Sequence, residues 1–460
     1  MTPRLGAPLS LLAAFLLLFS LGCSTGGGGD DPTLSVAVSR QPTIPGQGTR
    51  VFVSAEACQN CHGAIYADFR QTGHPYKLNK VVNGQMPTYP YSSIAGALER
   101  ITGAVNSLGA PQSYADVSYV IGGFGWKARW MDRNGFIVTG TGVQYNLDDG
   151  SMSAYNAAQV DKKYDCGECH TTGWRPFDAA LNPNRQDNLP GMEGTFHSTG
   201  VQCEACHGLG GIHVATMNKA DIVRKATPRT KAELEAADQA YGRAIACSEC
   251  HTRDGERNHA NGYVSPANAA GFAGVGGRIM AAGGLIQHHE QFDELLAIDP
   301  DNTAAGSTRM ASFQTAKFTC TACHDQHKVT IYKPGTPGRV GGGPGVKSSN
   351  ADCMTCHPNN DPAQSKHPAM AHLNCIDCHM PKMVKSATSR KSGGAVPVNI
   401  GDIKTHIFRI NLSKTDASQF TADGKFAYPY LTAQFACHQC HDGTRAHDRT
   451  DRNESGFDFH

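Results

Sequence analysis

The sequence predicts a mostly irregular chain with short α-helices, folded around a shared core that the polypeptide does not fill by itself, with one small β-meander near its start. Two observations lead to this prediction. The string C-x-x-C-H occurs eight times at irregular steps and accounts for 16 of the 17 cysteines. The chain also contains 51 glycines, and about 55 residues per string are too few for eight separate domains of ~100 residues.

Each string has the spacing that attaches c-type haem. Two thiols add to the vinyl groups on one porphyrin edge, and the histidine that follows reaches the iron. Chance placement predicts roughly 0.03 such strings in this chain. Disulfides and zinc sites are the alternatives, but neither requires a histidine after each pair.

The sequence therefore predicts eight haem c groups, numbered here in chain order. Their attachment cysteines are Cys58 and Cys61, Cys166 and Cys169, Cys203 and Cys206, Cys247 and Cys250, Cys320 and Cys323, Cys353 and Cys356, Cys375 and Cys378, and Cys437 and Cys440. Their proximal iron ligands are His62, His170, His207, His251, His324, His357, His379 and His441.

Residues 1–22 have the pattern of an export signal, with Arg4 before an apolar run that is too short to span a bilayer. The segment Ser20-Leu21-Gly22-Cys23 resembles a bacterial lipoprotein cleavage box, although that pattern prefers leucine where Ser20 stands. Lipidation of Cys23 would account for the odd cysteine, and residues 23–50 would form a flexible tether. The alternative is that Cys23 is lost with an ordinary signal peptide. We expect an exported, lipid-anchored protein in the periplasm or at the outer membrane or cell surface.

The charge balance excludes one class of partner. The formal charge of +1 falls to 0 when residues 1–22 are removed, because Arg4 is the one charged residue among them. The polypeptide therefore offers no basic surface for nucleic acid. Haem propionates would add about eight negative charges to the oxidised protein.

The strings divide the rest of the chain. Residues 51–160 hold haem 1 and a β insertion, with strands predicted at 117–121 and 126–131, a turn at Asp132-Arg133-Asn134-Gly135 and a returning strand at 136–139. Residues 161–333 hold haems 2–5 and include a predicted helix over 231–246. A Pro/Gly linker at 334–345 separates them from haems 6–8 in residues 346–460.

Eight second axial ligands must come from thirteen further histidines. His327 lies too close to His324 to serve the same iron, so we expect it to serve a neighbouring haem. His438 lies inside its own attachment string and His460 at the terminus, so both are expected to face solvent. His197, His367 and His447 are reserves, and Met380 leaves from the proximal side and is expected to pack. The preferred distal ligands are His74, His213, His259, His288, His289, His327, His372 and His406.

His288 and His289 are adjacent, which suggests a bridging role. On an extended segment their side chains point to opposite faces, so the two imidazoles would bind two irons, one on either side of the strand. The alternative is that one of them is a ligand and the other is solvated.

Three strings resemble those of the large multihaem c-type cytochromes of anaerobic and metal-respiring bacteria: residues 200–208 (GVQCEACHG), residues 375–381 (CIDCHMP) and residues 402–408 (DIKTHIF). The last resembles a distal-ligand segment, which supports His406. Some octahaem members of this group act on nitrogen or sulfur oxyanions, and others conduct electrons, including some that form filaments. The haem-lysine motif of pentahaem nitrite reductases is absent from the sequence. The resemblance implies redox partner proteins or other multihaem cytochromes, including a homopolymer of this chain.

Electron transfer and catalysis make different demands on the irons. A conduit needs every iron six-coordinate, whereas an enzyme needs one open iron with acid, base or cationic groups around it. The supply of histidines is sufficient for complete bis-His ligation, and no local cluster of Lys, Arg and Tyr marks a substrate pocket. The sequence therefore favours an electron-transfer protein, with an octahaem oxidoreductase acting on a small nitrogen or sulfur oxyanion as the alternative.

Overall fold

The computed structural model describes residues 51–226, 242–253, 278–296, 320–339, 341–359, 372–393, 397–411, 418–437 and 439–441. The signal, the tether and Cys23 lie outside the described residues. So does most of the predicted helix over 231–246, together with His259, His367, His438, His447 and His460. Among the helices that are described, none is long and apolar enough to cross a membrane.

The helices are short, and most of them coincide with the attachment strings. Two cysteines three residues apart lie on the same side of a helical turn, so a single turn presents both thiols to one porphyrin edge. The fifth attachment string has a 3-10 turn at Cys320–Ala322 in place of an α-helix. The α-helices are α2 (Ser54–Phe69), α3 (Gly167–His170), α4 (Cys203–His207), α5 (Gly211–Thr216), α8 (Cys247–Cys250), α9 (Gln291–Leu296), α11 (Asn350–Met354), α12 (Cys375–His379) and α13 (Ala433–Cys437).

The insertion between haems 1 and 2 is a six-stranded sheet. Its strands are β1 (Leu78–Lys80), β2 (Thr102–Ala104), β3 (Val117–Gly122), β4 (Lys127–Asp132), β5 (Gly140–Asn146) and β6 (Met152–Tyr155). They are ordered β1-β3-β4-β5-β2, with β6 paired to β5. Strands β3 and β4 occupy the two segments predicted as strands and pair antiparallel. The predicted return at 136–139 forms no named strand and contributes two isolated bridges, from Ile137 to Met131 and to Lys162.

The two faces of this sheet carry different side chains because successive residues of a strand point to opposite sides. Val120, Ala128 and Trp130 are fully buried in a cluster on one face. On the other face, Met131 belongs to a second cluster, which also packs against Cys166 of the haem 2 string. Positions 127 and 129 of β4 share a face with Met131, so they lie on the side of the sheet that faces haem 2.

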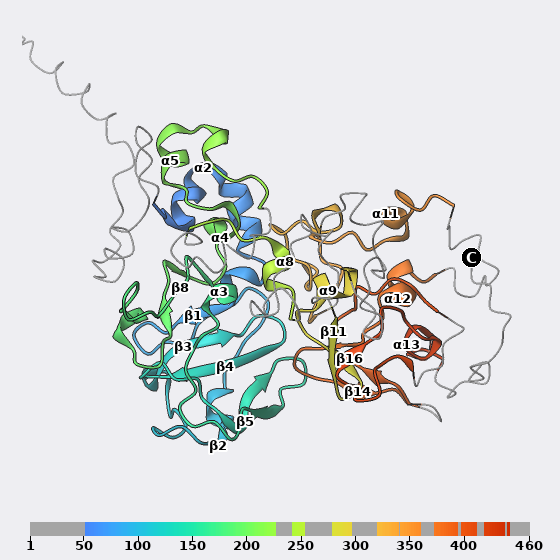
Figure 1. Ribbon diagram of the computed structural model, residues 1–460, viewed down its shortest axis with the longest axis horizontal. Coiled ribbons are helices and arrows are strands. Elements are labelled where there is room, and N and C mark those ends of the chain that lie inside the picture. Colours follow the sequence, from blue (N-terminus) through green and yellow to red (C-terminus); the bar gives the residue numbers. More distant parts are fainter. Residues whose placement is uncertain are drawn as a thin grey trace, which may run out of the picture.

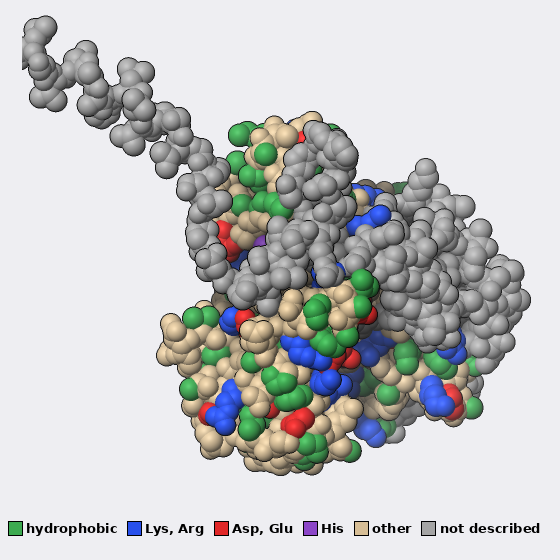
Figure 2. Space-filling model, turned by 60° about the vertical axis from the view of Figure 1, so that its left-hand side comes forward, with side chains coloured by type: hydrophobic (Ala, Val, Ile, Leu, Met, Phe, Trp, Pro, Cys, Tyr) green, Lys and Arg blue, Asp and Glu red, His purple; other side chains and the backbone are tan. Residues whose placement is uncertain are grey.

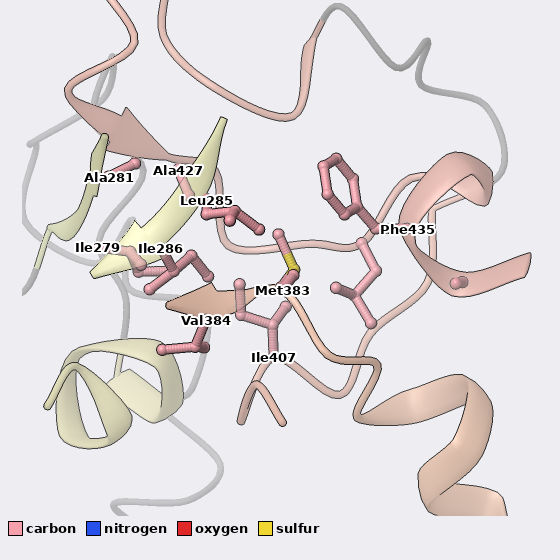
Figure 3. Packing of buried hydrophobic residues seen from close by; sticks show 11 residues of the cluster. Ile279, Ala281, Leu285, Ile286, Met383, Val384, Ile407, Ala427 and Phe435 are labelled. Carbon is pink, nitrogen blue, oxygen red and sulfur yellow. The ribbon is translucent and has the colours of Figure 1, made fainter. Parts of the chain in front are cut away.

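Short strands join the middle of the chain to its C-terminal part. These are β11 (Ile279–Ala282), β12 (Leu285–Gln287), β13 (Val384–Lys385) and β16 (Phe426–Ala427), in the order β13-β12-β11-β16. Their apolar side chains meet those of Met383, Ile407 and Phe435 in one buried cluster (Figure 3). Strands from the segment predicted to hold haems 2–5 thus pair with strands from the segment predicted to hold haems 6–8.

The remaining strands are two-residue pairs. These are β7 (Thr171–Thr172) with β10 (Ser198–Thr199), β8 (Arg175–Pro176) with β9 (Gly194–Thr195), and β14 (Arg390–Lys391) with β15 (Asn399–Ile400). Figure 1 shows α2, α4 and α5 above the six-stranded sheet, α8 and α9 near the middle, and α11, α12 and α13 on the other side. On the face in Figure 2, basic, acidic and apolar side chains are mixed, with several Lys and Arg side chains near its centre.

Candidate haem sites

The attachment cysteines are all free thiols, as haem attachment requires. The disulfide alternative therefore has no counterpart among the described residues. Nor do these residues contain a group of three or more His, Cys, Asp or Glu side chains arranged to hold a metal ion.

The first four strings lie against one another. Helix α2 packs on α4, and α3 packs on α8. The thiols of Cys58 and Cys203 are in hydrogen-bond contact, which joins strings 1 and 3, and those of Cys169 and Cys250 join strings 2 and 4. Strings 3 and 4 are joined by the backbone, where the amide of Ile245 donates to the carbonyl of Ala205 at 2.8 Å.

The other strings continue this series. The thiols of Cys247 and Cys320 are in contact and join strings 4 and 5. The amide of Lys347, just before string 6, donates to the Cys323 carbonyl of string 5 at 2.9 Å. Oδ1 of Asn350, at the start of helix α11 that leads into string 6, accepts the Cys375 amide of string 7 at 2.8 Å. Helix α12 packs on α13, which joins strings 7 and 8. The neighbours therefore form one series, 1-3-4-5-6-7-8, and string 2 adjoins string 4.

Four of the predicted distal histidines lie across from proximal ones. A metal-bound imidazole nitrogen lies about 2 Å from the metal and about 1 Å from its own ring centre, so two imidazoles on opposite faces of one iron have centres roughly 6 Å apart. The four observed separations match this value. The ring-centroid distances are 6.4 Å for His62 and His213, 6.4 Å for His74 and His251, 6.1 Å for His207 and His327, and 6.0 Å for His324 and His406.

Hydrogen bonds fix which ring nitrogen can bind a metal. Nδ1 of His207 lies 2.6 Å from the Val223 carbonyl oxygen, and Nδ1 of His213 lies 2.9 Å from that of Asn218. Nδ1 of His379 lies 2.6 Å from the Phe408 carbonyl oxygen. A carbonyl only accepts, so each Nδ1 carries the proton and each Nε2 keeps its lone pair for a metal. The donor set therefore fits haem iron.

Burial favours the same neutral form. It lowers the pKa of His74 to about 3, of His251 to about 4 and of His406 to about 3. A neutral imidazole is the form that binds iron.

His288 and His289 differ from the predicted bridge. His289 has a φ of 67°, so the chain turns there instead of continuing as an extended strand. The two rings consequently lie with centroids 4.5 Å apart rather than on opposite faces. The ring of His289 is also 5.6 Å from that of His251, which already has His74 across from it. His372 is exposed.

Four basic side chains from three segments gather around His288, and we call Lys77, Lys127, Arg129 and Arg253 the cationic cluster. Nε of Arg253 donates to the His288 carbonyl at 2.7 Å, and its Nη2 lies 3.2 Å from His288 Nε2. Lys127 Nζ donates to the Ser386 carbonyl at 2.6 Å. The Arg129 guanidinium lies 3.6 Å above the Tyr155 ring.

The members of the cluster act electrostatically on one another. Burial lowers the pKa of Lys127 well below its usual range, and Arg129, Arg253 and Lys77 lower it further, while Asp402 raises it. Burial, followed by all four cations, lowers the pKa of His288. Burial lowers the pKa of Arg129, and the nearby Tyr155 and the thiol of Cys166 oppose this shift. This places the cluster beside the haem 2 string, in surroundings suited to an anion.

No local pattern predicted this cluster, since its members are far apart in sequence. The one available signal was β4, where Lys127 and Arg129 alternate with the buried Ala128 and Trp130. A basic strand face behind a buried apolar face indicates an internal anion site, and the sequence prediction missed it.

The attachment strings, their helical turns and the opposed imidazoles define a multihaem c-type cytochrome, and the chain belongs to this class. The family described as cytochrome c554 and c-prime matches residues 143–208, which contain strings 2 and 3. The dissimilatory sulfite reductase MccA of Wolinella succinogenes is 21% identical over 435 residues, covering 80% of this chain and 55% of that protein. The chain thus spans about half the length of this curated relative.

Three solved structures are similar at low identity. The octahaem sulfite reductase MccA of Wolinella succinogenes, form II, has a TM-score of 0.49 at 16% identity, covering 86% of this chain and 66% of that one. The outer cell wall cytochrome OcwA has a TM-score of 0.44 at 16% identity, covering 85% and 83%. The undecahaem cytochrome from the S-layer of Carboxydothermus ferrireducens has a TM-score of 0.35 at 17% identity, covering 75% and 52%.

Proposed function

We propose that this chain is an electron-transfer protein that carries eight covalent c-type haems with bis-His ligation. The observation that carries the proposal is the set of four imidazole pairs whose ring centroids lie 6.0 to 6.4 Å apart. Two imidazoles on one iron leave no open position for a substrate, and they keep the coordination sphere unchanged between the two oxidation states. Haem iron supplies the chemistry, since it takes up and releases one electron.

The contacts between strings support a continuous route. Each thiol is attached at a porphyrin edge, so thiols in contact bring the edges of two attached groups together. The series 1-3-4-5-6-7-8 therefore gives every haem of the trunk a neighbour on each side, except for those at its ends. Haem 2 is a side branch at haem 4, where Cys169 meets Cys250.

The protein residues hold the ligands in place. The carbonyls of Val223, Asn218 and Phe408 fix the tautomer of three imidazoles. Gly200, with a φ of +70°, lets string 3 approach the segment that carries His74, because a Cβ there would lie 2.0 Å from the Pro75 carbonyl oxygen. The amide of Val201 then donates to the His74 carbonyl at 2.9 Å.

Low-temperature EPR of the oxidised, fully matured protein tests this proposal. Replacing His213, His74, His327 or His406 singly with alanine should convert one low-spin haem to high-spin, and a different haem in each variant. His197→Ala is the matched control and should convert none. If the four variants keep every haem low-spin, the assigned pairs are not axial ligands and the proposal fails.

A second candidate function rests on the cationic cluster. Buried Lys and Arg side chains beside the haem 2 string suit a small nitrogen or sulfur oxyanion, the substrate class expected for an octahaem oxidoreductase. The alternative anions for these cations are the haem propionates, which are carboxylates.

The same EPR measurement separates the two functions. An enzyme would show one high-spin haem in the unmutated protein, and adding sulfite or nitrite would change that signal. Lys127→Met should abolish the change, whereas the exposed control Lys80→Met should not. Eight low-spin haems in the unmutated protein, unaffected by either anion, would rule out the enzyme and leave propionates as the anions.

We also propose export and attachment to a membrane through lipidated Cys23, with redox proteins or further copies of this chain as partners. The export signal and the cleavage box in residues 1–23 support this proposal.

A further inference from the structure

Helix α9 lies against the proximal ligand assigned to haem 4. Oε1 of Gln291 is 3.1 Å from Nδ1 of His251, and the amide of Phe292 donates to the His251 carbonyl at 2.9 Å. Asp293 accepts the Thr252 hydroxyl at 2.7 Å and the Arg253 amide at 3.0 Å. The first turn of α9 thus holds both the ring and the backbone of this ligand.

The next residue of α9 reaches the distal ligand assigned to haem 5. Oε2 of Glu294 accepts the Thr405 hydroxyl at 2.7 Å and the backbone amide of His406. The same oxygen is 3.9 Å from Nδ1 of His406. Glu294 is only 2% exposed, so water does not screen its carboxyl group from the imidazole.

We infer that Gln291 and Glu294 are positioning residues that give two neighbouring haems different potentials from one short helix. The inference rests on the proposed function, because it takes His251 and His406 as axial ligands of haems 4 and 5. A neutral amide oxygen faces one imidazole, and a carboxyl group faces the other.

The direction of each effect follows from charge. Oxidation adds one positive charge to the haem iron, and a nearby carboxylate stabilises this charge. The carboxylate of Glu294 therefore lowers the potential of haem 5 relative to a neutral acceptor in its place. Gln291 gives haem 4 a hydrogen bond without that charge, so haem 4 keeps a higher potential.

The structure allows an exchange of the two groups. Glu294→Gln keeps an oxygen that accepts from Thr405 and His406 but removes the negative charge. Gln291→Glu keeps the acceptor for His251 and adds a charge. The matched controls are Glu99→Gln and Gln85→Glu, which make the same changes at exposed positions.

A redox titration of the full-length holoprotein, followed by low-temperature EPR, measures the outcome. The measurement is made at an alkaline pH, at which carboxyl groups are ionised. Haem 5 is the component that becomes high-spin in His406→Ala, and haem 4 is the one that does so in His74→Ala. We expect Glu294→Gln to raise the potential of haem 5 and Gln291→Glu to lower that of haem 4, with every haem still low-spin and both controls unchanged.

Two results would overturn the inference while the ligand assignment stands. One is that neither component moves in the exchanged variants. The other is that all components move together and that the surface controls move them equally, which would reflect net charge alone. If His406→Ala and His74→Ala leave every haem low-spin, it is the ligand assignment of the proposed function that fails.

Discussion

His197 is a histidine without an assigned iron. Its ring stacks on Phe52 with centroids 4.9 Å apart, and its Nδ1 lies 2.8 Å from Ser198 Oγ. Burial lowers the pKa of His197 to about 4, below the value of about 6.5 in an unfolded chain. As the pH falls, the unfolded state therefore binds this proton first. The stability contributed by neutral His197 is complete above pH 6.5 and is lost as the pH falls towards 4.

We therefore expect the free energy of unfolding to fall by up to about 2 kcal/mol between pH 7 and pH 5 through His197. Guanidinium unfolding of the holoprotein at both pH values measures this change. His197→Phe keeps a ring to stack on Phe52 and cannot be protonated. The free energy of unfolding of this variant should therefore fall less between the two pH values, by that amount. An equal loss in both proteins would show that His197 does not titrate in this range.

Single residues also show what the sequence could predict at the sites. A cysteine pair and the next histidine identify an attachment site because all three act on one porphyrin within a single turn. A distal ligand has no such neighbour, since His74 meets His251 from a distant part of the chain. His327 was expected to bind a haem other than the one bound by nearby His324. Its ring faces that of His207. The φ of His289 was not predictable, because a positive φ at histidine depends on the surrounding fold.

At the scale of elements, helix α4 holds the start of α2. Glu204, between the cysteines of string 3, is 3% exposed. Its carboxylate accepts the amides of Val53 at 3.0 Å, Ser54 at 3.0 Å and Gly210 at 2.8 Å. Burial raises the pKa of Glu204, and these amides lower it. One carboxylate thus joins the helices of strings 1 and 3 and the turn before α5.

Glu204→Ala should leave these buried amides without an acceptor and destabilise this part of the molecule by roughly 3 kcal/mol. Hydrogen exchange of the α2 and α5 amides measures the change, and protection in the six-stranded sheet should stay the same. Glu204→Gln retains one acceptor oxygen and should lose less stability than Glu204→Ala. If α2 exchanged equally fast in both variants and in the unmutated protein, Glu204 would not be the link between the helices.

Elements differ in how far local sequence determines them. Strands β3 and β4 were predictable because an apolar run, a turn and a second apolar run lie within one short segment. Strands β11 and β16 were not, because Ile279 pairs with Ala427 across most of the C-terminal part of the chain. Helices of four to six residues gain little from their own hydrogen bonds. Their positions follow from haem attachment, which the strings do reveal.

At the scale of the whole molecule, the contacts between strings give a trunk with one branch. The thiols of Cys247 and Cys320 are in contact between strings 4 and 5, and in the proposed function every electron crossing the trunk takes this step. String 2 meets string 4 through Cys169 and Cys250. Figure 1 places α2, at the haem 1 end, and α13, at the haem 8 end, on opposite sides of the molecule, with α8 between them.

Loss of a trunk haem and loss of the branch haem should therefore have different effects. The variant with Cys320→Ala and Cys323→Ala lacks attachment of haem 5, and the variant with Cys166→Ala and Cys169→Ala lacks that of haem 2. Each protein would be fixed to an electrode through a tag inserted into the tether of residues 23–50, before string 1, after mass spectrometry has shown seven haems. Without haem 5, we expect haems 6, 7 and 8 to be reduced much more slowly than haems 1, 3 and 4, because the remaining contacts do not span the gap. Without haem 2, all seven haems should be reduced at the rate of the unmutated protein. If loss of haem 2 slowed haems 6 to 8 as much as loss of haem 5 does, haem 2 would be part of the trunk and the branched order would be wrong.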